Sequence, residues 1–403
     1  MPNNSNLAPA LVVGLEVNGL GITRALARSK IPSIGFSTPS WHPSWWTNSC
    51  RLVSATAWTK EAVVEDLVRV GSALPKKAPI LITKDETVMW VSEEREQLSR
   101  HYEINLPDDD VVNLLMDKQK FTELALAEGW PVPKTWFVNS REDLTSSLKE
   151  MVYPCILKPA VKNEEFRAKA PDKAWRVSSE KELIQVYEMV AQWEKEVVIQ
   201  EWIEGGDDRV AYCLTYYNRD SRPLALYAGR KLRQWPIDCG VTALAEPAPK
   251  KWAGDLIDLT DTIFRKVGYR GLGSIEYKMR LGSDEPVIME PTVGRTNKQN
   301  EIAVVNGQNI PAIAYFDLIG SGYYPACTNL KPVKLVDGWA EPRAAWLYFR
   351  DGRLSIPRWL ADWRGKKRFM RLRLSDPGPY TALIYRNVRG VVRRIVRLLT
   401  GRK

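Results

Sequence analysis

The sequence predicts an α/β protein with more than one domain, and three observations support this prediction. Its 403 residues are enough for two or three hydrophobic cores. Short apolar strands alternate with segments of helical period over residues 10–83, which favours a parallel sheet with crossover helices. The hydrophobic share of 44% and the charged share of 26% are ordinary for a globular protein, so we expect a folded chain.

The first segment, residues 1–112, is expected to be an open α/β domain. Apolar runs bounded by glycine and polar residues indicate its strands, and apolar residues spaced three and four apart indicate its helices. We expect, in order, a strand at 10–14, a turn at 18–21, a helix at 22–29, a strand at 31–36, a helix at 62–70 and a strand at 78–83.

The second segment, residues 113–328, begins with a helix that Asp117 caps and that runs to about Glu128. Gly129 and the prolines after it end this helix. We then expect a strand at 135–138, a helix at 140–151, strands at 155–158 and 197–200, and paired strands at 212–217 and 224–229 around a turn at 218–222.

The third segment, residues 329–403, is rich in Trp and Arg and ends in a basic helix. From Arg386 to Lys403 there are seven basic residues and no acid, so the net charge of +10 falls to 10 − 7 = +3 without them. Apolar residues recur at helical spacing among these arginines. Such a helix can lie on an anionic membrane surface, or it can pack on its own domain. Because the charge belongs largely to this tail, we do not expect nucleic-acid binding.

The remaining composition indicates a cytoplasmic protein. Residues 1–9 lack the charge pattern of a signal peptide, and no apolar run approaches about 18 residues. The five cysteines are scattered without a CxxC pair, which argues against disulfides and zinc, and two histidines leave few candidates for histidine catalysis. We expect a cytoplasmic protein, in peripheral contact with the inner membrane face if residues 386–403 bind lipid.

The strongest chemical signal is a predicted hairpin that carries two carboxylates. Alternating strands flank a turn at 282–284, and a centre at Ser283 places Glu276 opposite Glu290. Opposed side chains lie about 4.5–5.5 Å apart at Cβ, where two carboxylates repel unless a cation lies between them. Mg²⁺, or Mn²⁺ in its place, bound by these oxygens and by nucleotide phosphates would satisfy this requirement. A pair of surface acids is the alternative.

Three further cations lie near these elements in the sequence. Lys118 starts a helix and Lys158 closes an apolar strand, so each could meet phosphate oxygens. Arg295 follows the second carboxylate and could neutralise a transferring phosphoryl group. Taken singly, each lysine fits a surface role better, and Arg295 fits a surface ion pair equally well.

A second basic segment lies on the strand and loop at 228–242. Lys231 and Arg233 alternate onto one face, so both are expected to point at one anion. We assign Lys231, Arg233 and Arg295 to catalysis, with a solvated basic face as the alternative.

Residues 200–208 join a buried strand to acids and glycines. Exposed backbone groups in such a turn can bind an adenine edge, while a carboxylate such as Asp208 holds the ribose hydroxyls. Taken alone, this is a common strand-to-turn sequence.

The order of these signals resembles the ATP-grasp superfamily over roughly residues 10–325. Residues 117–121 look like its first nucleotide lysine and helix, 156–159 like its second lysine, and 200–203 like its hinge. The resemblance implies an ATP-grasp fold with a Rossmann-like domain before it and the basic extension after it. It also implies that the first domain helps to bind a carboxylate substrate.

The resemblance assigns roles to individual residues as well. It implies that main-chain atoms of Glu201 and Ile203 hold adenine and that Glu276 and Glu290 bind magnesium. Thr292 departs from the pattern, because the family usually has Asn at this position. Its hydroxyl is a weaker metal ligand, which leaves the number of magnesium ions open.

The function that the resemblance implies is a ligase that joins a small-molecule carboxylate to an amine. ATP would phosphorylate the carboxylate, and the amine would displace phosphate from the acyl phosphate to form an amide, in peptide-like or cell-envelope synthesis. A nucleotide-binding or regulatory protein on the same scaffold is the alternative that Thr292 supports. A nicotinamide-dependent enzyme rests only on Gly14, Gly19 and Gly21, whose spacing is not the G-x-G-x-x-G fingerprint.

Overall fold

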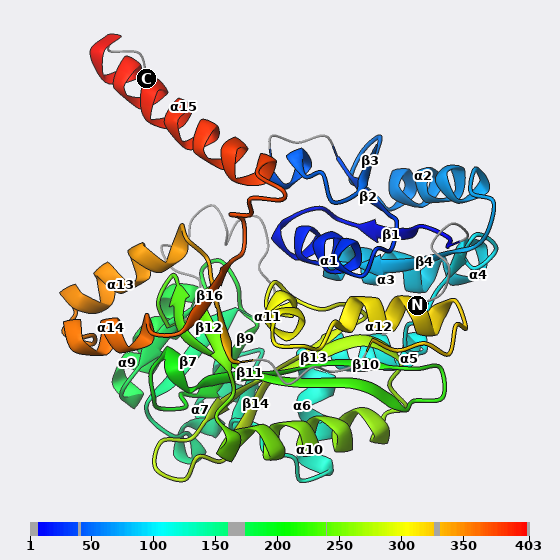
Figure 1. Cartoon of the computed structure of the whole chain (residues 1–403). Coiled ribbons are helices and arrows are strands. Elements are labelled where there is room, and N and C mark those ends of the chain that lie inside the picture. The colour runs from blue at the N-terminus through cyan, green and yellow to red at the C-terminus, as the bar shows by residue number, and fades with distance from the viewer. Residues whose placement is uncertain (1–6, 39–41, 160–173, 239, 326–330, 401–403) are drawn as a thin grey trace. The chain divides into compact units, whose positions relative to one another are not determined.

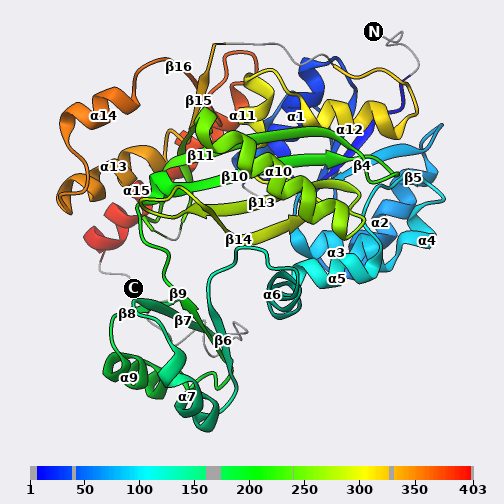
Figure 2. The ribbon, with the colours of Figure 1, turned by 90° about the horizontal axis from the view of Figure 1, so that it is seen from below.

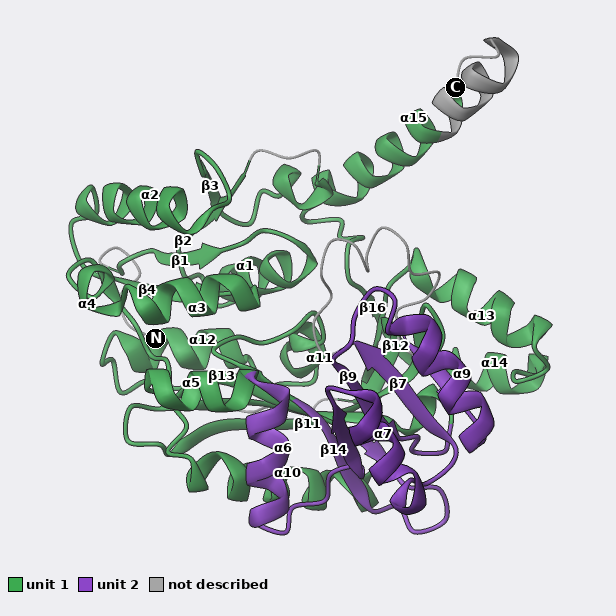
Figure 3. Cartoon of the chain, turned by 180° about the vertical axis from the view of Figure 1, so that it is seen from behind, with its two compact units in different colours: residues 1–116, 206–276, 291–403 green, residues 117–205, 277–290 purple. Residues whose placement is uncertain are grey.

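The computed structural model describes most of the chain and divides it into two compact units. The described residues are 7–38, 42–159, 174–238, 240–325 and 331–400, of which 391 and 393–400 are described by their backbone alone. Unit 1 holds residues 1–116, 206–276 and 291–403, and unit 2 holds residues 117–205 and 277–290 (Figure 3). The units cut across the three segments predicted from the sequence, because the predicted hairpin contributes residues to both.

Unit 1 begins with the parallel sheet that the alternation of strands and helices predicts. Its order is β3-β2-β1-β4-β5, and every pair in it is parallel. The strands are β1 Ala10–Val13, β2 Ser33–Ser37, β3 Arg51–Ser54, β4 Ala78–Ile82 and β5 Tyr102–Glu103. The helices around them are α1 Val17–Arg28, η2 Pro43–Trp46, α2 Lys60–Ser72, α3 Asp85–Glu93, α4 Arg95–Leu98 and α5 Asp109–Met116 (Figure 1, blue and cyan).

Helix α1 begins at Val17, five residues before the start that the sequence predicted, so the expected turn at 18–21 is wrong. The chain turns earlier, at Gly14, whose φ of +93° suits glycine. A Cβ on Gly19 would lie 1.9 Å from the Gly14 carbonyl oxygen, so this glycine lets α1 pass close to the turn. The glycines therefore set the approach of α1 to β1.

The second sheet of the chain has seven strands in the order β14-β13-β10-β11-β12-β15-β16. The strands are β10 Val210–Tyr217, β11 Pro223–Trp235, β12 Val241–Pro247, β13 Gly271–Met279, β14 Pro286–Val293, β15 Val333–Val336 and β16 Lys366–Phe369. The predicted pairing of β10 with β11 is confirmed, with Asn218 N donating to Arg222 O across the turn. The other elements are η4 Asp207–Arg209, α10 Lys250–Lys266, α11 Asn300–Val305, α12 Ile310–Leu318, α13 Ala340–Arg350, α14 Ile356–Asp362 and α15 Gly378–Thr400.

The core of unit 1 lies around α11 and α12, between the two sheets (Figures 1 and 2). α12 is buried all round rather than along one stripe, which is the pattern of a helix enclosed by protein. One continuous apolar cluster joins it to Ile22 and Leu26 of α1 and to Tyr212 and Leu214 of β10. The first sheet and the second sheet therefore share one core.

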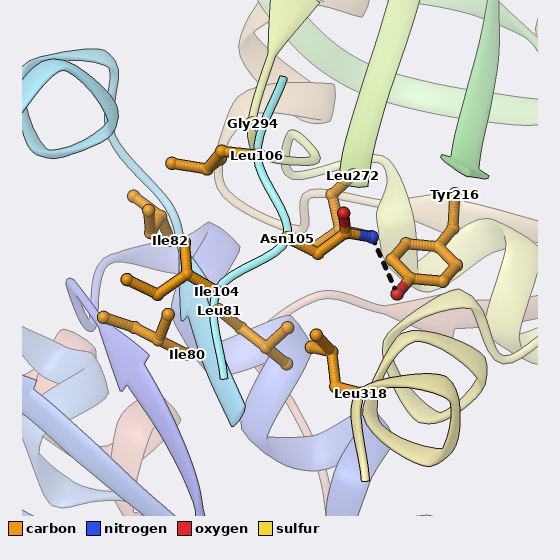
Figure 4. A pocket seen from close by; sticks show the side chains of 10 residues that line it. All are labelled: Ile80, Leu81, Ile82, Ile104, Asn105, Leu106, Tyr216, Leu272, Gly294 and Leu318. Atoms are coloured by element: carbon orange, nitrogen blue, oxygen red, sulfur yellow. Dashed lines mark hydrogen bonds between the residues drawn. The ribbon is translucent and has the colours of Figure 1, made fainter. Parts of the chain in front are cut away.

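A small gap remains where β4 and the chain after β5 approach the second sheet (Figure 4). Asn105 Nδ2 donates to the hydroxyl of Tyr216 at 3.0 Å and to the carbonyl of Tyr217 at 2.9 Å, so the polar groups beside the gap are partnered. Its volume of about 10 Å³ is at the lower limit for a single water molecule. We therefore treat it as a packing gap and not as a ligand site.

Unit 2 contains an antiparallel four-stranded sheet in the order β6-β9-β7-β8. The strands are β6 Thr135–Val138, β7 Cys155–Pro159, β8 Trp175–Val177 and β9 Val197–Glu201, and the helices are α6 Lys118–Ala127, α7 Arg141–Ser147, η3 Leu148–Glu150 and α9 Glu180–Val190. Its core includes Leu144 of α7, Leu157 of β7 and Leu183 of α9. The predicted Asp117 cap is confirmed, since its carboxylate accepts from Gln119 N and Lys120 N.

The C-terminal helix α15 begins at Gly378, before the basic stretch that starts at Arg386, so it is longer than the predicted basic helix. Within the described part of the chain, no helix has the length and apolar character needed to cross a membrane. Residues 401–403 and the arginine side chains beyond Arg389 lie outside the described residues, so the predicted basic tail is described only in part.

A buried ion pair fastens the segment before α15 to the first sheet. Arg24 of α1 donates to Asp376 through Nε at 2.7 Å and to the Met370 carbonyl through a terminal nitrogen at 2.7 Å. The same carboxylate accepts from the Thr47 hydroxyl at 2.7 Å and from Asn48 N at 2.9 Å. Both charged side chains are at most 5% exposed, so each depends on the other for charge compensation.

We predict that Asp376→Ala lowers the free energy of unfolding by about 3–5 kcal/mol, because it leaves the buried Arg24 without its carboxylate. Urea unfolding followed by circular dichroism measures this change. Arg100→Ala is the control, because the Arg100–Glu96 pair is exposed and should contribute less than about 1 kcal/mol. Equal effects of the two substitutions would contradict the prediction.

Candidate active site

Unit 2 positions the two lysines that were predicted to bind nucleotide. Lys118 is the first residue of α6, is exposed, and follows the Asp117 cap. Lys158 lies on β7, half-buried, and its Nζ donates to Gln200 Oε1 at 3.0 Å. Gln200 in turn donates to the Thr135 hydroxyl at 3.1 Å, so the Lys158 ammonium is held by a chain of contacts across the sheet. The predicted nucleotide role of Lys118 and of Lys158 stays a prediction.

The predicted hinge begins at the end of β9, where Glu201 is tightly held. Its N–H donates to the Lys134 carbonyl at 2.8 Å, and its carboxylate accepts from Lys134 N at 3.1 Å and from Arg280 at 2.8 Å. Burial raises the pKa of Glu201, but the hydrogen bonds from Arg280 and Lys134 outweigh it and lower the pKa below its usual value. Glu201 is therefore ionised, and its N–H is used within unit 2. Ile203, two residues on, is buried.

A stacked cluster around Trp202 was not predicted from the sequence. Lys278 Nζ lies 5.2 Å from the Trp202 ring centroid, and the Arg176 guanidinium lies 5.1 Å from it. Lys278 is 9% exposed although it carries a charge. Cation–π contacts of this kind stabilise a desolvated ammonium beside the hinge. In the sequence, this cluster could have been found only from the position of Lys278, two residues after Glu276 on the same predicted strand.

The predicted hairpin of β13 and β14 forms, with a turn slightly different from the expected one. Arg280 N donates to Glu285 O at 2.8 Å and Asp284 N to Arg280 O at 3.1 Å, so the turn is centred between Gly282 and Ser283. Glu276 is half-buried on β13, Glu290 is exposed on β14, and Thr292 is half-buried two residues further. Counted from this centre, position 276 pairs with Met289 and not with Glu290, so the turn does not support the predicted opposition of the two carboxylates, which stays a prediction.

The donor set of this hairpin fits a nucleotide-bound magnesium ion. Among the described residues, no three His, Cys, Asp or Glu side chains gather closely enough to hold a metal by themselves. Mg²⁺ at nucleotide sites usually binds through one or two protein carboxylates and through phosphate oxygens, so two carboxylates and a hydroxyl are sufficient. Glu276, Glu290 and Thr292 are the residues that would hold it, and this assignment stays a prediction.

Lys231 of β11 lies against one of these carboxylates. Its Nζ is 2.6 Å from Glu276 Oε2 and donates to Gln234 Oε1 at 2.8 Å. The Lys231 side chain is 4% exposed, whereas that of Glu276 is 27% exposed. The carboxylate therefore reaches solvent while the ammonium that holds it is buried. Lys231 is placed to fix the orientation of Glu276.

Arg233 does not share an anion with Lys231, which corrects the prediction from strand alternation. Its guanidinium is 3% exposed and forms ion pairs with Glu341 of α13 at 2.8 Å and with Asp362 of α14 at 2.5 Å. The register of β11 against β12 shifts between Lys231 and Arg233, and such a bulge breaks the two-residue alternation. Arg233 is thus a structural residue of unit 1, which the sequence could not distinguish from a catalytic one.

Arg295 takes the surface ion pair that the sequence left as its alternative. Its Nε lies 2.6 Å from Asp85 Oδ1 and a terminal nitrogen donates to Asp85 Oδ2 at 2.8 Å, a bidentate pair with α3. The Asp85 side chain is 55% exposed, so this pair is open to solvent. The structure gives Arg295 an ion-pair partner 210 positions away, on α3.

Asp207, rather than its neighbour Asp208, organises the chain after β9. Asp207 is 2% exposed and accepts from Gln234 N, Gln234 Nε2 and Asp238 N at 2.8–3.1 Å. Asp208 is 46% exposed and lies 3.7 Å from Arg358. Asp208 is therefore accessible from solvent, and its predicted nucleotide role stays a prediction.

Lys298, a buried lysine within electrostatic range of Lys231, was not predicted as a site residue from the sequence. Lys298 lies between β14 and α11, and its Nζ is 3.8 Å from Asp337, which also pairs with Arg371 at 2.9 Å. Burial lowers the pKa of Lys298 to about 8, and the neighbouring charges of Arg371 and Lys231 act in the same direction, whereas Asp337 opposes them. Three cations therefore face the two carboxylates Glu276 and Asp337. This excess of positive charge favours an incoming anion.

Buried polar groups without hydrogen-bond partners lie on the chain around Lys298 and at the start of α1. Thr296 is fully buried, and its hydroxyl has no hydrogen-bond partner among the described residues. The same holds for both amide atoms of Asn300, which is 1% exposed. Asn18 donates to the Thr296 carbonyl at 2.7 Å, while its own Oδ1 is unpartnered. Buried polar groups are normally satisfied, so these atoms are available to a polar ligand or to ordered water.

The described cysteines do not provide a nucleophile. Cys50, Cys155 and Cys213 are free thiols, and burial raises their pKa values to about 11, 11 and 12. A thiol is nucleophilic as its thiolate, which these environments disfavour. Cys239 and Cys327 lie outside the described residues.

Known proteins resemble this chain in sequence and in fold, although no family model matches it. A D-alanine–D-alanine ligase of Pseudomonas entomophila is 24% identical over 176 residues, which is 40% of this chain and 50% of that protein. A D-aspartate ligase of Enterococcus faecium is 21% identical over 323 residues, covering 76% of this chain and 75% of that protein. The chain thus spans about half the length of the D-alanine–D-alanine ligase it matches.

The structural match decides the fold. The N5-carboxyaminoimidazole synthetase of Staphylococcus aureus, solved with ADP, superposes with a TM-score of 0.61 at 12% identity and 82% coverage of both chains. This chain has the ATP-grasp fold. The ATP-grasp fold therefore extends over about four-fifths of its residues, as the order of motifs predicted.

We predict that Lys298→Met stabilises the ATP-grasp chain at pH 7, because it removes a buried ammonium whose folded pKa is about 8. Between pH 8 and the unfolded pKa near 10.5, the wild-type fold has released this proton while the unfolded chain still holds it, so wild-type stability rises with pH. The advantage of the variant should shrink by up to about 3 kcal/mol over this range. Urea unfolding at pH 7 and pH 10 measures it, and a difference that does not change with pH would refute the assignment.

Proposed function

We propose that this protein is an ATP-dependent carboxylate–amine ligase. The observation that carries the proposal is the Lys231–Glu276 pair, which presents a half-buried carboxylate on an ATP-grasp fold. Lys231 also lies within electrostatic range of Lys298, which shares Asp337 with Arg371. A carboxylate that can hold a nucleotide metal and cations that attract an anion are the two requirements of phosphoryl transfer to a carboxylate.

The proposed reaction has two steps that need no protein nucleophile. The substrate carboxylate oxygen attacks the γ-phosphorus of ATP, the bond to the β-phosphate oxygen breaks, and ADP leaves. An amine nitrogen then attacks the acyl carbon, the carbon–oxygen bond to phosphate breaks, and an amide and phosphate result. Magnesium would neutralise phosphate charge in the first step. The absence of reactive thiolates among the described cysteines is compatible with this route.

Each proposed residue acts by binding or by charge. Lys118 and Lys158 hold nucleotide phosphates, Glu201 and Ile203 the adenine, and Asp208 the ribose. Lys231 fixes Glu276 for the metal, and Lys298 attracts the substrate carboxylate, which relieves its unfavourable buried charge. The unpartnered Asn18, Thr296 and Asn300 offer hydrogen bonds to the same substrate.

We propose that at least one of the two substrates, the carboxylate or the amine, is an amino acid. The D-aspartate ligase that covers 76% of this chain carries an amino acid in its name, as do the D-alanine–D-alanine ligases. A place in cell-envelope synthesis in the cytoplasm follows from the same analogy and forms part of the proposal. A screen of D- and L-amino acids for ADP release tests it.

A nucleotide-binding protein without ligase activity is the second candidate. Two observations favour it: Thr292 replaces the usual Asn, and Arg295 pairs with Asp85 rather than with a site residue. Such a protein would bind ATP but release no ADP with any acid and amine. ADP release therefore separates the two candidates.

We predict metal-dependent ATP binding that Glu276→Gln and Glu290→Gln each weaken by about 10- to 100-fold, the range found when even outer-shell metal partners are lost. Isothermal calorimetry with and without magnesium measures the affinity. Glu285→Gln is the matched control, because Glu285 is an exposed acid in the turn of the same hairpin. If wild type binds no ATP with magnesium present, the ligase proposal fails.

We also predict that substitutions of two neighbouring cations of β11 have different effects, one on activity and the other on stability. Lys231→Met should abolish ADP release with a small loss of stability, because the Glu276 carboxylate that it leaves is 27% exposed and can be hydrated. Arg233→Met should lower the free energy of unfolding by about 3–5 kcal/mol, because it leaves the Glu341 carboxylate, 1% exposed, without a cation. Urea unfolding and an ADP assay on both variants check this. Similar effects of both substitutions would contradict the assignment of Lys231 to the site.

A further inference from the structure

A groove of about 470 Å³ lies in unit 1 between α15 and the chain around β16. Its lining is almost wholly apolar: Trp339, Phe369 and Leu372 form one side, and Leu383, Ile384 and Val388 of α15 are among the residues of the other. The volume lies within the range of about 300–1,000 Å³ that is typical of ligand sites. The groove is therefore large enough for an apolar chain.

The apolar face of α15 is covered at its start and open further along. Leu383 is 4% exposed, whereas Ile384, Val388 and Val392 are 47%, 55% and 51% exposed. On the opposite wall, Trp339 is 45% and Leu372 is 40% exposed. Isolated exposed apolar residues are normal, but a contiguous set that lines one groove indicates a binding surface.

The polar atoms in this groove indicate an oxygen-bearing ligand. Asn387 Nδ2 is buried among apolar residues and has no hydrogen-bond partner within the described part of the chain. Arg371 also lines the groove and shares Asp337 with Lys298. An unsatisfied buried donor costs stability unless an acceptor reaches it, and a carboxylic ester or phosphate oxygen is such an acceptor.

The other faces of α15 carry positive charge. At 100° per residue, Arg386 and Arg389 lie roughly 200° and 140° around the helix from Ile384, away from the groove. Residues 378–403 contain no Asp or Glu. At the edge of the groove, the Arg343 guanidinium stacks 3.8 Å from the Trp339 ring centroid. An anionic lipid surface matches this region in both polarity and charge, because α15 has an apolar face, Trp339 lies at its edge and cations surround it.

We propose that α15 and this groove bind the surface of an anionic lipid bilayer. The apolar face of α15 enters the headgroup region, a lipid chain occupies the groove between Phe369 and Val388, and Asn387 donates to a lipid oxygen. Arg386 and Arg389 contact the anionic headgroups. Since the described chain holds no helix that could cross the membrane, the contact is peripheral. This property goes beyond the ligase proposal and does not depend on it.

The test is co-sedimentation of the full chain with vesicles of phosphatidylcholine that contain phosphatidylglycerol, and with vesicles of phosphatidylcholine alone. Binding is expected to the anionic vesicles and to weaken at high salt, since each arginine near the surface contributes through screened attraction. Ile384→Asp should reduce binding about tenfold or more, because a charge replaces a side chain that the membrane buries.

Ile356→Asp is the matched control, because Ile356 is 65% exposed on α14 and does not line the groove. It makes the same chemical change and should bind vesicles like wild type. Both substitutions lie at exposed positions, so circular dichroism should show folded proteins. Vesicle binding and circular dichroism are measured without ADP release, so a failure of the ligase proposal stays distinct from a failure of this one.

Asn387→Leu separates a lipid contact from a purely structural role. It removes an unsatisfied donor, so it should raise or preserve the thermal midpoint in solution, and it should still reduce vesicle binding several-fold. Wild type that ignores anionic vesicles, or Ile384→Asp that binds them like Ile356→Asp, would overturn the proposal. A solution dimer that Ile384→Asp dissociates, without vesicle binding, would instead assign the groove to a second copy of the chain.

Discussion

The burial of two cations on one strand is the constraint on which unit 1 depends. Lys231 and Arg233 lie two residues apart on β11, each at most 4% exposed, so each needs an anion from another element. Arg233 fixes α13 and α14 through Glu341 and Asp362, and Lys231 fixes β13 through Glu276. A bulge between them directs the two charges to different partners. The same strand thus supports the C-terminal helices and orients a candidate metal ligand.

The sequence predicted the elements that local patterns determine. It did not predict the ion pairs that residues far apart in the chain form. The parallel first sheet, the Asp117 cap and the β10–β11 pairing follow from periodicity and turn residues within short windows. The partner of Arg295 lies 210 positions away, and no spacing rule connects them. The bulge in β11 has no glycine to mark it, so alternation wrongly placed Arg233 beside Lys231. Long-range charge pairing is a property of the packed fold, and it decides which cations are structural and which remain for chemistry.

Lys298 shows that a buried cation without a close counter-ion lowers the stability of the free fold. Its ammonium lies among Lys231 and Arg371 with Asp337 as a counter-ion at 3.8 Å, so its charged form is disfavoured and its pKa is lowered to about 8. A residue selected for stability alone would be apolar here. An anion bound beside it would restore the favourable charge balance and raise the pKa again. Binding affinity for an anion can therefore originate in a charge that the free fold stabilises poorly.

The groove of α15 and the charged cluster are connected through one carboxylate. Asp337 accepts from Arg371, which lines the groove, and lies near Lys298, which belongs to the cluster around Glu276. It also accepts from Trp339 N at the start of α13, and this hydrogen bond holds the carboxylate in place. Negative charge that engages Arg371 from the groove would leave more of Asp337 to Lys298 and so stabilise its ammonium. Because both sites act on the same carboxylate, their electrostatics are coupled within unit 1 without any change in the fold.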